Sequence, residues 1–145
     1  MNHKIFIKAC ELLKASGSSY EELISPFWSE VQDGVALPTL GKVIPRMAPE
    51  RRECSWNEAM ADAAAVGLAL PSREELQYMY KYLDHINALL VAHGGDRLPR
   101  NKDFWSLKEH SQDNAWYVYF GSGYAGSLSK CFDLYVRPLA EFKKL

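Results

Sequence analysis

The chain has 145 residues, of which 48% are hydrophobic and 24% are charged, and its formal net charge at pH 7 is −1. This length suits one domain with its own core, and the balanced charge does not indicate nucleic acid as a partner. No segment approaches the ~20 apolar residues that a membrane-spanning helix needs, so no membrane span is expected.

The first 30 residues are predicted to form an N-terminal helical extension. Apolar side chains recur at helical spacing over residues 2–15, and Ser19 with Glu22 fits a capping box for a short second helix. The segment lacks the features of a signal peptide, so we expect synthesis in the cytoplasm, with later display on a virion or a cell surface left open. Residues 31–145 are predicted to form the main domain.

Glycine and proline residues punctuate the start of the main domain and bound two short apolar segments. We interpret these segments, residues 35–37 and 42–44, as short strands or extended loop. Arg51 and Arg52 follow as a basic pair, which we interpret as solvated surface, with an anion-binding site as the alternative.

Two helix starts come next, at Ser55 and at Ser72, and each serine is followed three residues later by a glutamate. This spacing predicts a capping box, in which the serine and glutamate side chains satisfy free backbone amides of the first turn. The first helix is predicted to end at Gly67. The second pattern continues toward Gly94, and because it is unusually long we expect a break within residues 84–87.

The last third of the chain contains two segments in which apolar and polar residues alternate, as in strands with one buried face. In residues 115–120, the side chains predicted to be buried are Trp116, Val118 and Phe120. In residues 131–137, the side chains predicted to be buried are Phe132, Leu134 and Val136. A Gly- and Ser-rich loop of about ten residues separates the segments, which are therefore predicted to pair as antiparallel strands.

Several short motifs follow one another between residues 55 and 142. The most specific are Leu70-Pro71-Ser72, Phe104-Trp105-Ser106 and Tyr135-Val136-Arg137-Pro138. Their order resembles a family of bacterial and phage domains with the C-type-lectin-like fold. This family includes the C-terminal domain of collagen-like adhesins and the variable proteins of diversity-generating retroelements, with formylglycine-generating enzymes as distant relatives. The chain departs from the pattern at Leu68-Ala69, where Trp-Arg is usual, and at Leu107, where a second serine is usual.

The resemblance implies an α+β domain of C-type-lectin-like fold, with two helices packed on a small antiparallel sheet. It also implies non-catalytic recognition of a protein or glycan ligand, with residues 105–137 as the segment that a retroelement would diversify. One alternative is an enzyme related to formylglycine-generating proteins, although these rely on a cysteine pair and the C-terminal region holds Cys131 alone. The other is a structural or oligomerisation domain, in which residues 1–30 pack against a second copy to form a homo-oligomer.

The candidate ligand-binding residues lie on the outward faces of the predicted strands, in the loop between them, or beside them. They are Trp105, Tyr117, Tyr119, Ser122, Tyr124, Ser127, Asp133 and Tyr135. Mixtures of tyrosine and serine provide rigid contact area together with adaptable hydrogen bonds, which favours binding. Two alternatives stay open, namely that exposed tyrosines reflect ordinary β-propensity and that Trp105 belongs to the core.

No pattern indicates catalysis, a metal or a cofactor, and none of these is expected. The four histidines lack metal-ligand spacing, and the three cysteines form no CxxC pair. The odd number of cysteines also argues against a disulfide scaffold. Gly121, Gly123 and Gly126 spell a GxGxxG string, but a strand pattern follows it where a dinucleotide-binding motif requires a helix.

Overall fold

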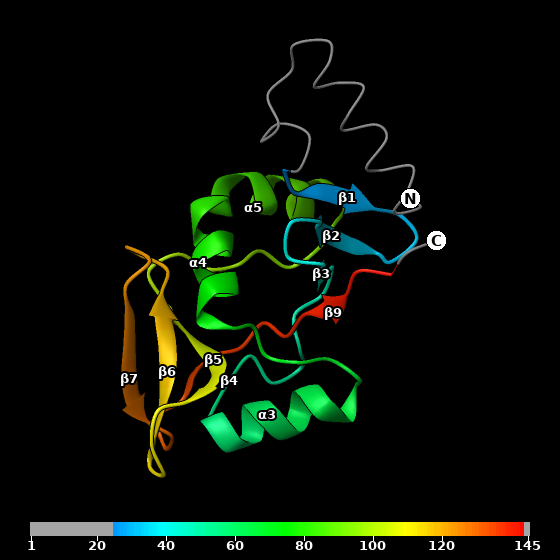
Figure 1. The fold of residues 1–145 in the computed structure, drawn as a ribbon. Coiled ribbons are helices and arrows are strands. Elements are labelled where there is room, and N and C mark those ends of the chain that lie inside the picture. Colours follow the sequence, from blue (N-terminus) through cyan, green and yellow to red (C-terminus); the bar gives the residue numbers. More distant parts are fainter. Residues whose placement is uncertain (1–24, 144–145) are drawn as a thin grey trace.

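A computed structural model describes residues 25–143 of the chain. In this part, two sheets are accompanied by the helices α3 (Trp56–Ala65), α4 (Arg73–Lys81) and α5 (Leu83–Ala92), so the predicted α+β class is confirmed (Figure 1). The two helices predicted before Pro26 lie outside the described residues.

The first sheet has the strand order β1-β2-β3-β9 and is antiparallel throughout. Its strands are β1 (Phe27–Ser29), β2 (Gly34–Leu37), β3 (Lys42–Pro45) and β9 (Ala140–Glu141). β2 and β3 show that the two short apolar segments at the start of the main domain are strands, which was one of the two interpretations left open. β1, however, belongs to the segment that was predicted to be a helical extension. A helix does not continue through Pro26, and Trp28 then packs against the core, so this part of the chain joins the sheet.

The second sheet has the strand order β4-β8-β5-β6-β7. Its strands are β4 (Glu53–Cys54), β5 (Asp103–Glu109), β6 (Asn114–Tyr119), β7 (Ala125–Ser129) and β8 (Leu134–Tyr135). β8 runs antiparallel to β4 and parallel to β5, whereas β5, β6 and β7 form an antiparallel meander.

The predicted pairing of residues 115–120 with residues 131–137 is wrong. β6 pairs instead with β7, which lies in the segment predicted to be a loop, and the register places Val118 opposite Ala125. Phe132, predicted to be buried, is 56% exposed because it lies in the turn between β7 and β8. The small residues of β7 carry no apolar alternation, so the strand left no periodic signal in the sequence.

The predicted helix caps are confirmed. Ser55 and Ser72 each accept a hydrogen bond from the backbone amide of the glutamate three residues on, and each glutamate reaches back to the amide of its serine. Gly67 follows α3 with a φ of +73°, a left-handed conformation that glycine adopts at low cost. The break in the second helical pattern comes earlier than predicted. Tyr82, with φ −105° and ψ 22°, is both the C-cap residue of α4 and the N-cap residue of α5.

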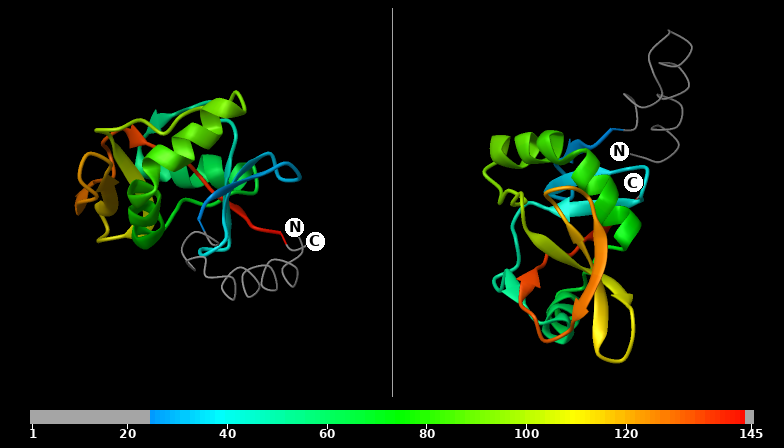
Figure 2. Two further views of the ribbon diagram at one scale, coloured as in Figure 1. Left: turned by 90° about the horizontal axis from the view of Figure 1, so that it is seen from above. Right: turned by 90° about the vertical axis from the view of Figure 1, so that its left-hand side faces the viewer.

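The helices form layers on both faces of the second sheet (Figures 1 and 2). α4 and α5 lie between the two sheets and build the larger core cluster with strands of both. Its fully buried side chains include Val35, Leu37, Ile44, Leu76, Met79, Leu83, Ile86, Leu90, Phe104, Val118 and Phe120. α3 covers the opposite face of the second sheet. There a second cluster contains Cys54, Trp56, Ala59, Ala63, Leu70, Trp105, Ala115, Leu134 and Val136.

Because both faces of the second sheet are covered, the prediction of one buried face was only partly right. Val118 and Phe120 are fully buried as predicted, but Trp116 is only half-buried. The Trp116 ring lies under the Arg73 guanidinium, 4.1 Å from the ring centroid, at the start of α4. Its neighbour Ala115 is fully buried on the other face, beneath α3.

Candidate functional site

Three tyrosines gather at one end of the second sheet, and we call Tyr117, Tyr119, Tyr124 and Asp103 the tyrosine cluster. Asp103 of β5 is the cross-strand partner of Tyr119 on β6, so the two side chains lie on the same face. Tyr117 is two residues from Tyr119 and shares that face. Tyr124 comes from the turn that leads into β7, and its carbonyl accepts a hydrogen bond from the Tyr119 amide at 2.8 Å.

Two glycines make room for the rings of the tyrosine cluster. Gly126 lies opposite Tyr117 in the β6–β7 ladder. A Cβ atom at Gly126 would lie 2.9 Å from the Tyr117 hydroxyl oxygen and 2.9 Å from a ring carbon of Tyr124. A Cβ atom at Gly121 would lie 2.3 Å from the Tyr119 ring. The rings therefore rest directly on backbone, which no larger residue at these positions would allow.

Partial burial shapes the electrostatics of the cluster. Burial raises the pKa of the Asp103 carboxyl. The pKa of the Tyr117 hydroxyl is also raised, mainly by burial and further by the Asp103 carboxylate and by Tyr124. Tyr124 is 62% exposed, whereas Tyr117 and Tyr119 are half-buried. The surface therefore presents aromatic rings, hydroxyl groups and a single carboxylate, a combination suited to contact with a ligand.

The other predicted site residues are not all brought to this surface. Ser122 lies in the β6–β7 turn, where its hydroxyl accepts a hydrogen bond from the Tyr124 amide at 3.3 Å, beside the cluster. Ser127 is the cross-strand partner of Trp116, which places it on the opposite face of the sheet. Asp133 is exposed in the turn between β7 and β8, apart from the tyrosines.

Trp105, also predicted to bind ligand, is a core residue. Its side chain is fully buried beneath α3, and its Nε1 donates a hydrogen bond to the Cys54 carbonyl at 2.9 Å. A side chain without exposed surface cannot contact a ligand in this structure, so the core alternative is correct for Trp105.

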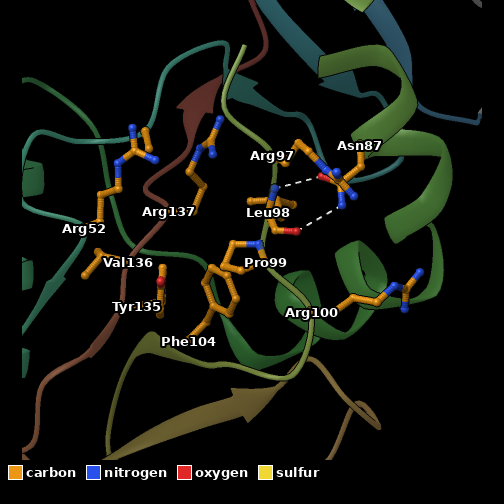
Figure 3. A pocket seen from close by; sticks show the side chains of 11 residues that line it. Arg52, Asn87, Arg97, Leu98, Pro99, Arg100, Phe104, Tyr135, Val136 and Arg137 are labelled. Atoms are coloured by element: carbon orange, nitrogen blue, oxygen red, sulfur yellow. Dashed lines mark hydrogen bonds between the residues drawn. The ribbon is translucent and has the colours of Figure 1, made fainter. Parts of the chain in front are cut away.

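Tyr135 faces the other side of the sheet and lines a separate pocket of about 380 Å³ (Figure 3). We call it the arginine pocket, because four guanidinium groups surround it. Its lining residues include Arg52, Arg97, Leu98, Pro99, Arg100, Phe104, Tyr135 and Arg137. Sequence reasoning missed this site because its arginines come from three separate segments. The only available signal was the basic pair at Arg51 and Arg52.

A larger and more apolar pocket of about 810 Å³ lies between α3 and residues 45–51. Cys54 lines it as a buried free thiol, and burial raises the pKa of this thiol to about 11. Cys131 is also a free thiol but is exposed. The two cysteines therefore differ sharply in access to solvent.

Within residues 25–143, no group of three or more His, Cys, Asp and Glu side chains is arranged to hold a metal ion. None of the helices described there combines the length and the apolar character that crossing a membrane requires.

Comparison with known proteins adds no assignment. The chain matches no protein-family model. No curated protein shows significant sequence similarity to it.

Proposed function

We propose that this protein recognises a protein or glycan ligand without catalysis, and that the tyrosine cluster is its contact surface. The observation that carries the proposal is the placement of three tyrosine rings over backbone at Gly121 and Gly126, with the Tyr124 side chain largely exposed. Tyrosine has few rotatable bonds, so rings held in this way lose little conformational entropy on binding. Aromatic side chains of this kind supply much of the binding energy at known interfaces.

We also propose that the domain has the C-type-lectin-like fold. The support comes from where the shared motif residues lie. Trp56, Pro71, Trp105 and Arg137 are all buried. Motifs carried by core positions reflect a common packing arrangement more than a common ligand, as expected for a shared fold with divergent surfaces.

In the same proposal, the three tyrosines of the cluster lie on the part of the chain that a retroelement would diversify, residues 105–137. The genomic neighbourhood provides the test. A reverse-transcriptase gene with a nearby template repeat that matches the sequence encoding this segment would support diversification. A neighbourhood without such a repeat would remove that part of the proposal while leaving ligand recognition intact.

Ligand recognition is tested with labelled protein on a glycan array and with a phage-displayed peptide library. Tyr119→Ala/Tyr124→Ala is the test variant, and Phe132→Ala is the matched control, since Phe132 is an exposed aromatic residue outside the cluster. We expect binders of the unmodified protein to be lost with the test variant and kept with the control. Binders that tolerate the double substitution would place the ligand site elsewhere.

A further inference from the structure

The arginine pocket collects positive charge from segments far apart in the sequence. Arg52 precedes β4, Arg97 and Arg100 lie in the connection from α5 to β5, and Arg137 follows β8. Figure 3 shows the Arg137 side chain rising between those of Arg52 and Arg97, above Phe104 and Tyr135. Guanidinium groups repel one another, so their convergence on one pocket favours a negatively charged group there.

The carboxylates of the protein compensate only half of this charge. Arg52 pairs with Asp96 at 3.2 Å, and Arg100 pairs with Asp84. Arg97 has no ion pair or hydrogen bond from its guanidinium within the described part of the chain. Arg137 is held only by backbone carbonyls, including that of Asp96 at 2.8 Å. Two guanidinium groups therefore remain in excess of the carboxylates around the pocket.

Arg137 is the more unusual of the two. It is only 2% exposed, and its Nε is the one buried side-chain polar atom without a hydrogen-bond partner among the described residues. The pKa of Arg137 is lowered to about 10, mainly by burial, while the Asp96 carboxylate opposes this effect and the neighbouring Arg52 adds to it. A buried charge is unfavourable unless it is neutralised, and the Asp96 carboxylate near Arg137 is shared with Arg52. An anion in the pocket would offset part of this positive charge.

The rest of the pocket is apolar. Phe104 and Tyr135 form its floor with ring centroids 5.7 Å apart, and Leu98 and Pro99 form one wall. The Leu98 backbone is fixed by two hydrogen bonds with the buried Asn87 side chain, at 3.0 and 2.8 Å (Figure 3). This floor is positioned to accept a flat apolar group, and the volume of about 380 Å³ suits a small molecule.

We propose that the arginine pocket binds a small phosphate monoester, with the phosphate on the exposed Arg97 guanidinium, near the positive charge of the buried Arg137, and an apolar body beside Tyr135. The two uncompensated guanidinium groups match the charge of such a phosphate, which is about −1.5 to −2 at pH 7. A carboxylate would neutralise only one of them. Arginine also offers parallel N–H donors that fit phosphate oxygens.

The test uses the full chain and phenyl phosphate as the probe, with binding measured by isothermal titration calorimetry at low ionic strength. Arg97→Ala is the test variant, because Arg97 is exposed and its loss should not unfold the protein. Lys108→Ala is the matched control, since it removes one exposed positive charge outside the pocket. We expect saturable binding that Arg97→Ala weakens about tenfold or more and that Lys108→Ala changes by less than about twofold.

Arg137 is not substituted, because it donates hydrogen bonds to three backbone carbonyls and its replacement would disturb the fold. Its response to the ligand is measured by NMR instead. Its Nε–H signal in a ¹H–¹⁵N spectrum should shift on titration with phenyl phosphate. The Nε–H signal of Arg51, which donates to Asp62 outside the pocket, should not shift. Benzoate, with the same ring and a single charge, should bind about tenfold or more weakly than phenyl phosphate.

Three results would overturn the proposal. The first is the absence of saturable binding of phenyl phosphate. The second is an equal effect of Arg97→Ala and Lys108→Ala, which would indicate long-range attraction without a site. The third is benzoate binding as tight as that of phenyl phosphate, which would rule out selection for a dianion. None of these results bears on the tyrosine cluster, so the two proposals fail independently.

Discussion

Replacing Trp105 with phenylalanine is expected to destabilise the domain much more than the same replacement at Trp116. The indole N–H of Trp105 donates to the carbonyl of Cys54 at 2.9 Å, and phenylalanine would remove this buried hydrogen bond. The loss of this hydrogen bond costs about 0.5–1.5 kcal/mol. The smaller ring leaves unfilled volume in a fully buried site, which adds about 1 kcal/mol.

Trp116 lacks these constraints. It is half-buried, its main contact is the Arg73 guanidinium 4.1 Å above the ring, and phenylalanine keeps an aromatic face for that contact. We therefore expect Trp116→Phe to change the free energy of unfolding by less than about 1 kcal/mol.

The measurement is urea unfolding followed by far-ultraviolet circular dichroism, because tryptophan fluorescence would itself change with either substitution. The free energy of unfolding and its slope against urea are fitted for both variants, and an unchanged slope confirms that the comparison is valid. Equal losses for the two variants, or a larger loss at Trp116, would refute the reasoning. Either result would mean that the second sheet has one buried face, as the alternation in the sequence alone predicts.

Three further outcomes are expected. Burial raises the pKa of the Asp103 carboxyl, so its charged form destabilises the fold. Asp103→Asn should therefore raise the melting temperature at pH 7. This gain should vanish near pH 3, about where the carboxyl is neutral in the folded and the unfolded protein. A lower melting temperature at pH 7 would contradict this. Gly126→Ala should cost less than about 1 kcal/mol in urea unfolding, since the atoms it meets are the ends of side chains. It should nevertheless abolish binding of any ligand found on the tyrosine cluster, and retained binding would argue against that surface. Iodoacetamide should label Cys131 faster than Cys54 in a peptide map, because Cys54 is buried and its pKa is about 11; the reverse order would exclude the described packing of α3.

The starts of α3 and α4 were predictable because their signals are local. A serine followed three residues later by glutamate satisfies the first-turn amides wherever the helix later packs, so Ser55 and Ser72 identified both helix starts. The strands β2 and β3 were likewise marked by apolar runs between turn residues.

The pairing of the last strands was not predictable from local signals. Whether residues 125–129 or residues 131–137 pair with β6 depends on which side chains the rest of the fold covers. β8 pairs with β4 and β5, so the edge of β6 remains available for β7. The alternation rule also assumes one covered face, and it failed at Trp116 because α3 and α4 cover different parts of the two faces.

The two candidate sites also differ in whether a local pattern in the sequence indicates them. Tyr117 and Tyr119 share a face because they are two residues apart on one strand, so the tyrosine surface was visible in the sequence. The arginine pocket brings Arg52 next to Arg137 through the pairing of β4 with β8. No pattern within either segment reports that proximity.

The pairing of β3 with β9 bears on how the chain reaches its folded state. β1, β2 and β3 are contiguous and can form their antiparallel pairs as soon as they have been synthesised. The outer edge of β3 stays unpaired until Ala140, the partner of Val43, has been synthesised near the end of the chain. An unpaired strand edge is a template for association with other chains. During synthesis this edge is therefore open to association with other chains, and late, long-range strand pairing should make folding slow.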